Sequence, residues 1–169
     1  ETFVYFSMEA FYQATISFTS QNMGAGKVDR VYKVLKTGMI CSVVTGIAFG
    51  LAVVLFSHQL LGIYTTSEAV KTVGIERLRI IILTYGLCGL MEVTGGVMRG
   101  IGYSVLPTVV TLLGVCVFRV IWVVGLLSIP AFHSVITVYV SYPVSWALTF
   151  GAHLACFLWV KKHVLSKYQ

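Results

Sequence analysis

Long apolar stretches recur along the whole chain, and they constrain its fold more than any other feature. A helix needs roughly 20 mostly apolar residues to cross the hydrocarbon core of a bilayer. The sequence predicts five such spans, over residues 2–22, 37–57, 78–98, 105–128 and 134–160. Of the 169 residues 57% are hydrophobic and only 11% are charged, so a soluble fold of this size could not hide its apolar surface. We therefore predict an all-α polytopic membrane protein.

Two shorter amphipathic segments lie between the predicted spans. Residues 28–36 place apolar side chains opposite basic ones, and residues 67–77 interleave Glu68, Lys71 and Glu76 with apolar positions. Amphipathic helices of this kind lie in the membrane interface and do not cross it. We predict an interfacial helix in each segment, the second leading into the third span.

Basic residues are unevenly distributed among the predicted loops. Eight fall in the first loop, at the end of the third span and in the carboxyl tail, against three in the two outer loops. The eight are Lys27, Arg30, Lys33, Lys36, Arg99, Lys161, Lys162 and Lys167. Short loops rich in Lys and Arg stay on the cytoplasmic side. The first of the five alternating spans must then begin on the outer side of the cytoplasmic membrane, and the carboxyl terminus lies in the cytoplasm.

Four cysteines and four histidines show no spacing typical of a metal or catalytic site. They lie singly inside apolar runs or near span ends, without a C-x-x-C pair. They are Cys41, Cys88, Cys116, Cys156, His58, His133, His153 and His163. The net charge of +6 fits membrane topology, because a nucleic-acid interface needs a solvated basic face that this composition barely has. We predict no enzyme, no cofactor and no nucleic-acid partner.

Three charged residues, Glu9, Glu92 and Arg119, fall well inside predicted spans, away from the span ends. Such residues are costly in a bilayer and usually point to function. A rise of about 1.5 Å per residue places Glu9 and Arg119 at a similar depth, roughly 20 Å from the inner boundary, and Glu92 roughly 10 Å from it. Depth therefore favours a Glu9–Arg119 ion pair and leaves Glu92 without a basic partner. Glu92 can then exchange a proton or hold Na⁺, and Tyr85, seven residues earlier on the same helix face, is a candidate oxygen ligand.

Glu9 also begins a polar stripe on the first span. Glu9, Gln13 and Ser17 follow one another at intervals of four residues, which places them on one helix face. On an otherwise apolar helix such a face either lines a water-filled cavity or forms a hydrogen-bonded seam with another helix. Glu9 has a simpler alternative as well, which is to extend toward the outer surface.

Proline and glycine mark further positions in the spans. Pro143 falls inside the fifth span, where it is expected to kink or locally unwind the helix. Such breaks serve as hinges in some transporters and are packing features elsewhere, and both alternatives stay open. Gly46 with Gly50, and Gly96 with Gly100, have the G-x-x-x-G spacing that is typical of tight helix packing.

Four short stretches together carry a family resemblance. They are Gln21-Asn22-Met23-Gly24-Ala25-Gly26, Arg99-Gly100, Phe118-Arg119-Val120-Ile121-Trp122 and Tyr142-Pro143-Val144-Ser145-Trp146. In this order the chain resembles the multidrug and toxic compound extrusion (MATE) transporters. A similar Gln-Asn-x-Gly-Ala-Gly stretch follows the eighth of that family's twelve helices, and the other three resemble motifs of its tenth, eleventh and last helices.

The resemblance implies helices eight to twelve, most of one six-helix lobe of a two-lobed transporter. The implied function is export of drugs or organic cations in exchange for Na⁺ or H⁺, with membrane lipid and the missing amino-terminal lobe as partners. In many members a carboxylate on the tenth helix forms part of a cation site, and Glu92 is the acid on the matching helix. The alternatives are a flippase for lipid-linked oligosaccharide from the same superfamily and a membrane scaffold that does not transport.

Overall fold

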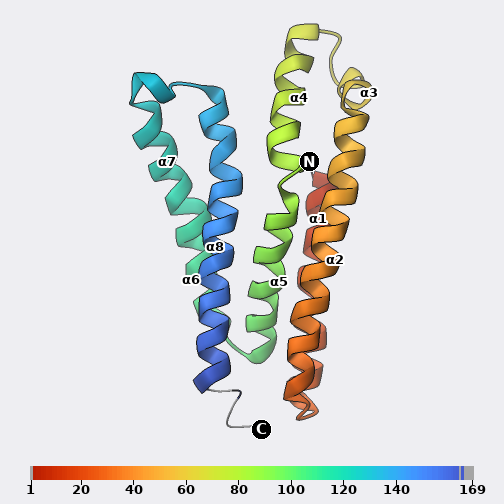
Figure 1. Ribbon diagram of the computed structural model, residues 1–169, viewed down its shortest axis with the longest axis vertical. Coiled ribbons are helices and arrows are strands. Elements are labelled where there is room, and N and C mark those ends of the chain that lie inside the picture. The colour runs from red at the N-terminus through yellow and green to blue at the C-terminus, as the bar shows by residue number, and fades with distance from the viewer. Residues whose placement is uncertain (1, 164, 166–169) are drawn as a thin grey trace.

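The computed structural model describes residues 2–163 and 165, which form helices and turns without a strand. Figure 1 shows the helices as one bundle. In chain order they are α1 (Thr2–Gly24), α2 (Val28–Leu55), α3 (Ser57–Gly62), α4 (Glu68–Ile82), α5 (Tyr85–Ile101), α6 (Val105–Thr111), the π-helix η1 (Leu112–Val117), α7 (Phe118–Leu127), the 3₁₀-helix η2 (Pro130–Phe132) and α8 (Val135–His163).

Three of the described helical segments are long and apolar enough to cross a membrane, namely Val28–Leu55, Val105–Leu127 and Val135–His163. A fourth span is obtained if the bent pair α4 and α5 counts as one. These segments confirm an all-α polytopic membrane protein. Helix α1 has 23 residues but is not among the sufficiently apolar segments, and its polar stripe explains why. The prediction that α1 crosses the membrane stays a prediction.

The predicted interfacial helix over residues 28–36 was wrong. Helix α2 begins at Val28 and continues without a break to Leu55, so the segment forms the first turns of a long helix. Its apolar residues Val31 and Leu35 are buried in a cluster with residues of α5 and α8. The apolar stripe therefore packs against neighbouring helices and not against the membrane interface.

The predicted boundary between an interfacial helix over residues 67–77 and a span over residues 78–98 also differs from the structure. Helix α4 runs past this boundary to Ile82, and the chain bends by 41° before α5 begins at Tyr85. At the bend the Thr84 hydroxyl donates to the carbonyl oxygens of Ile80 and Ile81, both at 2.9 Å. Hydroxyl groups that bond back to the preceding turn often bend helices.

The predicted unwinding at Pro143 does not occur, because α8 continues through Pro143 to His163. A missing N–H is tolerated in membrane helices when neighbouring helices support the chain. The departure from regular α-helix lies in the preceding span, at the π-helix Leu112–Val117 between α6 and α7. A hinge role for Pro143 stays a prediction.

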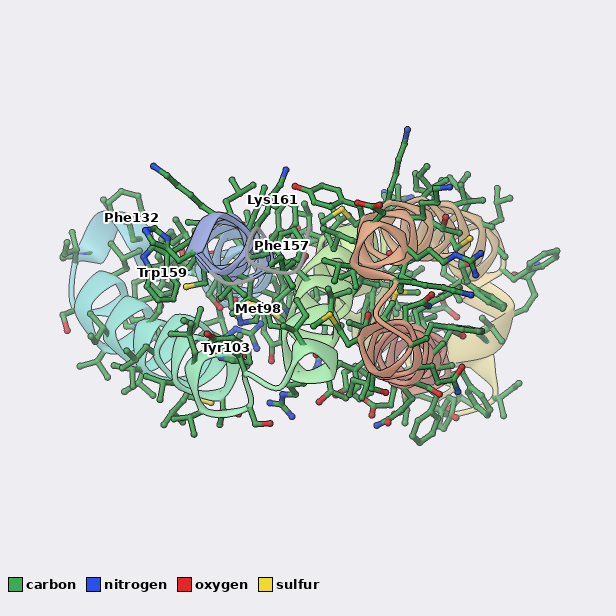
Figure 2. All side chains as sticks on the ribbon, turned by 90° about the horizontal axis from the view of Figure 1, so that it is seen from below. Met98, Tyr103, Phe132, Phe157, Trp159 and Lys161 are labelled. Atoms are coloured by element: carbon green, nitrogen blue, oxygen red, sulfur yellow. The ribbon has the colours of Figure 1, made fainter. Side chains whose placement is uncertain are left out.

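Tight packing at both G-x-x-x-G pairs is confirmed. A Cβ atom on Gly96 would lie 2.9 Å from the Tyr12 carbonyl oxygen of α1, so α1 and α5 approach closely there. A Cβ atom on Gly46 would lie 2.9 Å from the backbone nitrogen of Gly86. These crossings place α5 centrally, between α1 and α2 on one side and α8 on the other (Figure 2).

The three basic regions gather at one end of the bundle. The turn between α1 and α2, the turn after α5 and the end of α8 all lie at the bottom of Figure 1. Lys161 of α8 lies at this end with its ammonium nitrogen 4.3 Å from the centre of the Tyr32 ring of α2. Lys167 lies outside the described residues. The shared location is what the predicted topology requires, and the cytoplasmic orientation itself stays a prediction.

Candidate functional site

A polar cavity of about 400 Å³ lies between α1, α5, α6 and α8. Helices α1 and α5 provide most of its wall, and α6 and α8 contribute the remaining lining residues. The lining residues are Tyr5, Glu9, Tyr12, Gln13, Glu92, Gly95, Arg99, Pro107, Thr111 and His153. The cavity thus contains two carboxylates, one guanidinium and one imidazole.

The polar stripe of α1 supplies one wall of this cavity. Glu9 and Gln13 line it, and the Gln13 amide donates to Glu9 Oε1 at 2.8 Å. Ser17 is not part of the wall, and its hydroxyl oxygen instead accepts a hydrogen bond of 3.3 Å from the Gln21 amide. Two of the three residues on the predicted cavity face therefore reach the cavity.

Glu92 faces the same cavity from α5, and it is half-buried like Glu9. Neither carboxylate forms a salt bridge within 4.0 Å among the described residues. Arg99, two turns further along α5, uses its guanidinium elsewhere: it donates to the Tyr12 hydroxyl and, at 2.9 Å, to Thr108 Oγ1. The cavity therefore holds two carboxylates that no cation neutralises by direct contact.

His153 of α8 completes the site, and sequence reasoning missed it. Its side chain is only 2% exposed. Nδ1 lies 3.2 Å from the Met91 carbonyl oxygen, and Nε2 lies 3.2 Å from the Pro107 carbonyl oxygen. Gly95 permits this approach, because a Cβ atom there would lie 3.2 Å from His153 Cε1. The available signal was a single titratable residue inside an apolar span.

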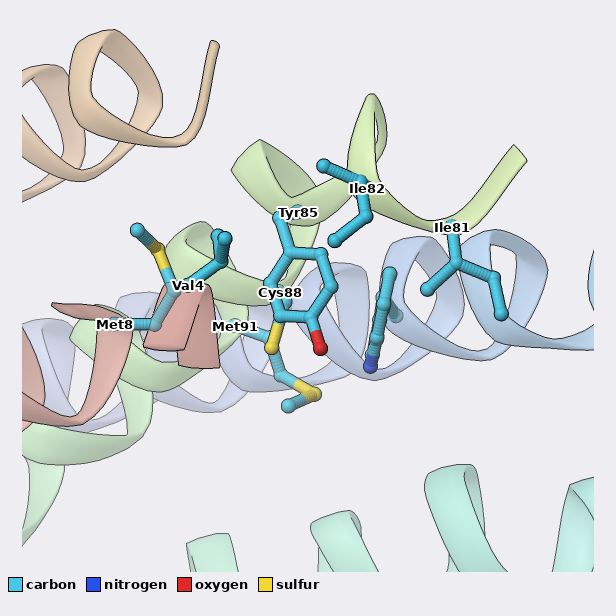
Figure 3. Close-up of a cluster of buried hydrophobic side chains, with 8 residues drawn as sticks. Val4, Met8, Ile81, Ile82, Tyr85, Cys88 and Met91 are labelled. Carbon is cyan, nitrogen blue, oxygen red and sulfur yellow. The ribbon is translucent and has the colours of Figure 1, made fainter. Parts of the chain in front are cut away.

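Tyr85 lies away from the cavity, contrary to its predicted role beside Glu92. It is 6% exposed and belongs to an apolar cluster near the bend between α4 and α5. Figure 3 shows its ring among Val4, Met8, Ile81, Ile82, Cys88 and Met91. A shared helix face was not sufficient, because seven residues correspond to about 10 Å along the helix axis.

The predicted ion pair between Glu9 and Arg119 was wrong. Arg119 Nε donates to Ser145 Oγ at 2.8 Å, and the guanidinium carbon lies 4.0 Å from the centre of the Tyr142 ring. The Trp146 ring is also close, with its centre 5.6 Å from the same atom. Helix α1 packs on α2 and α5, whereas α7 packs on α8, so equal depth did not place the two charges on adjacent helices.

The glycine-rich motif at the end of α1 leads into a tight turn. The backbone nitrogen of Ala25 donates to the Gln21 carbonyl at 3.0 Å, and that of Lys27 donates to the Asn22 carbonyl at 2.8 Å. Gly26 adopts a φ of 69°, a left-handed conformation that glycine accepts without strain. The motif Gln21, Asn22, Gly24, Ala25 and Gly26 thus ends α1 and directs the chain into α2.

The second motif contributes directly to the cavity and its packing. Arg99 lines the cavity, while Gly100 faces α1, where an added Cβ atom would lie 2.9 Å from the Ile16 carbonyl oxygen.

No group of three His, Cys, Asp or Glu side chains in the described part of the chain could hold a metal ion. The site is therefore best described as a small, charged cavity within a helix bundle.

Comparison with known proteins identifies the family. The MatE family profile matches residues 1–125. A curated relative, "Probable multidrug resistance protein YoeA" of Bacillus subtilis (strain 168), is 27% identical over 151 residues, which cover 87% of this chain and 32% of that protein. The chain thus spans about a third of the length of this relative. Because the profile covers most of the sequence, the chain belongs to the MatE family, whose members are transporters and not enzymes.

Proposed function

We propose that this chain forms most of one lobe of a cation-coupled antiporter that exports drugs or organic cations across the cytoplasmic membrane. The observation that carries the proposal is the pair of carboxylates, Glu9 and Glu92, in one cavity without a direct ion pair. An ionisable group inside a membrane domain is expensive to maintain, so its retention favours a role in moving ions or substrate. The Bacillus subtilis relative, a probable multidrug resistance protein by name, supports this proposal.

In this proposal Glu92 binds the coupling ion, which is H⁺ or Na⁺. The bound cation offsets the negative charge that two nearby carboxylates otherwise concentrate in a partly dehydrated space. Because residues of α1, α5, α6 and α8 together line the cavity, ion binding there favours the arrangement in which these helices meet. Ion binding is then coupled to drug export if the transporter also adopts another conformation that binds the ion less well. No cofactor takes part in this scheme.

The test is substitution of Glu92 in the full-length protein, expressed in a drug-sensitive bacterial host. Glu92→Gln keeps the shape of the side chain but removes its charge. We expect at least a tenfold loss of dye efflux driven by an imposed H⁺ or Na⁺ gradient in membrane vesicles. Glu76→Gln, on an exposed position of α4, is the matched control and is expected to leave efflux unchanged. Normal, ion-dependent efflux by the Glu92 variant would refute the proposed coupling role.

The two alternatives receive less support. A flippase for an anionic lipid-linked substrate calls for a basic groove, whereas this cavity has two carboxylates against the one guanidinium of Arg99. A scaffold would use its small-residue faces to recruit other proteins, but the faces at Gly96 and Gly46 pack inside this bundle. Lipid flipping by the full-length protein in vesicles would favour the flippase. A full-length Glu92→Gln protein that shows no efflux but keeps its normal cellular function would favour the scaffold.

A further inference from the structure

Both ring nitrogens of His153 face backbone carbonyl oxygens. The oxygens belong to Met91 of α5 and Pro107 of α6, and each lies 3.2 Å from its nitrogen. A carbonyl oxygen can only accept a hydrogen bond, so each contact requires an N–H on the ring. A neutral imidazole has one N–H and the imidazolium has two. The geometry at His153 therefore matches the doubly protonated ring.

The side chains around the cavity supply charges of both signs. The titratable and charged groups that face it are Tyr5, Glu9 and Tyr12 from α1 and Glu92 and Arg99 from α5, whereas α6 contributes none to the lining. The contacts with the Met91 and Pro107 carbonyl oxygens favour a positive ring, while Arg99 and the burial of His153 oppose it. Glu9 and Glu92 add negative charge to the same cavity. With a protonated His153 the two carboxylates are balanced by two cations, and without that proton one negative charge is left over.

We propose that His153 is a proton-binding site of this cavity and that its imidazolium form ties α8 to α5 and α6. The proposal deepens the proposed function, on which its relevance to transport rests. His153 Nδ1 contacts the backbone of Met91, which directly precedes Glu92 in α5, and both His153 and Glu92 line the cavity. When His153 loses its proton, the cavity is left with one uncompensated negative charge, which another cation such as Na⁺ can neutralise. The proton and this cation then compete for one cavity.

Thr111 gives the neutral ring an alternative partner. Its hydroxyl oxygen lies 3.3 Å from His153 Nε2. A hydroxyl can donate as well as accept, so it can turn its hydrogen toward a deprotonated Nε2. The Pro107 carbonyl then loses its donor, and the connection between α8 and α6 weakens, while the bond from Nδ1 to Met91 persists. Proton loss at His153 therefore changes one helix contact and preserves another.

The decisive experiment is nitrogen NMR of the full-length protein in lipid nanodiscs, with ¹⁵N-labelled histidine. We expect one buried imidazole with two N–H signals, which disappear in His153→Gln and persist in the exposed control His133→Gln. Thr111→Val removes the donor for the neutral ring, so it should raise the doubly protonated fraction at a fixed pH. This variant also keeps the test valid if His153→Gln fails to fold.

Two results would overturn the proposal. One is a His153 ring with a single N–H at every pH at which the protein stays folded. The other is a doubly protonated signal that Thr111→Val leaves unchanged or decreases. Neither measurement depends on transport, so an efflux-competent Glu92→Gln protein would refute the coupling role of Glu92 and still leave the His153 result interpretable.

Discussion

Half-buried charged side chains have different partners in the cavity lined by α1, α5, α6 and α8 and at the contact between α7 and α8. In the cavity, Glu9 and Glu92 form no salt bridge among the described residues. Between α7 and α8, Arg119 has the Ser145 hydroxyl at 2.8 Å and the Tyr142 ring centre at 4.0 Å. Arg119 thus has a hydroxyl and an aromatic ring as partners, although its Nη2 has no hydrogen-bond partner among the described residues, whereas the two carboxylates remain available to bind a cation. We infer that the cavity serves ion exchange and that the contact between α7 and α8 serves stability.

The largest expected effect comes from closing the approach between α1 and α5, which shapes the cavity. Gly96→Val would place side-chain atoms against the Tyr12 carbonyl, where even a Cβ atom would lie at 2.9 Å. Overpacking a tight contact costs about 3 kcal/mol. SDS titration of the purified full-length protein measures this loss. Gly125→Val, at a position with no atoms within 4 Å of an added Cβ, is the control. Equal stability of the two variants would contradict the close crossing.

The second prediction removes the aromatic partner of Arg119. Tyr142→Leu leaves the guanidinium without its closest ring and should cost about 2 kcal/mol, the range for a cation–π contact shielded from water. Tyr142→Phe keeps the ring and should retain most of the stability. The same SDS titration compares both variants. If the two variants were equally destabilised, the hydroxyl and not the ring would be the important group, and the contrast with the cavity would weaken.

The third prediction tests whether the cavity acids contribute to stability. Glu9→Gln and Glu92→Gln should each change the free energy of unfolding by less than about 1 kcal/mol, because neither removes a salt bridge. Vesicle efflux with Glu9→Gln is expected to fall less than with Glu92→Gln, since the Gln13 amide already occupies one oxygen of Glu9 at 2.8 Å. A strong loss of stability in either variant would assign the acids a structural role like that of Arg119.

The smallest expected effect concerns an ion pair at the other end of the bundle. Lys71 Nζ lies 2.8 Å from Glu68 Oε1, and the Glu68 side chain is 71% exposed. Exposed ion pairs contribute little because water and salt screen them. Glu68→Gln should therefore leave both the unfolding transition and efflux close to those of the unmodified protein. A large change in stability or efflux would show that an exposed ion pair matters as much as the half-buried charges, and would contradict the contrast drawn above.

Features that depend on the geometry of a single helix, such as its polar face and its apolar length, could be predicted from the sequence. The spacing of Glu9 and Gln13 identified the face that lines the cavity, and apolar length identified α2, the α6–α7 segment and α8 as spans. The G-x-x-x-G pairs identified close helix contacts. Each of these inferences needs only local geometry, because a helix repeats every 3.6 residues whatever surrounds it.

What sequence could not supply was the identity of the neighbouring helix. Arg119 lies at a suitable depth for Glu9, yet it packs against Tyr142 and Ser145 of α8. His153 belongs to the cavity only because Gly95 lets α8 approach α5. Nothing in the period of α8 distinguishes this histidine from one that faces lipid. Long-range packing therefore decided which polar residues meet.

The central position of α5 has a consequence for how this sequence can vary. Eleven of its 17 residues are buried, and Gly89, Gly95, Gly96 and Gly100 are among them. Helix α7, by contrast, has no buried residue among its ten. A saturation mutagenesis scan should therefore accept few replacements along α5 and many apolar ones along α7. Apart from Arg119, which contacts Ser145 and Tyr142, α7 should therefore accept more apolar divergence among related proteins than α5.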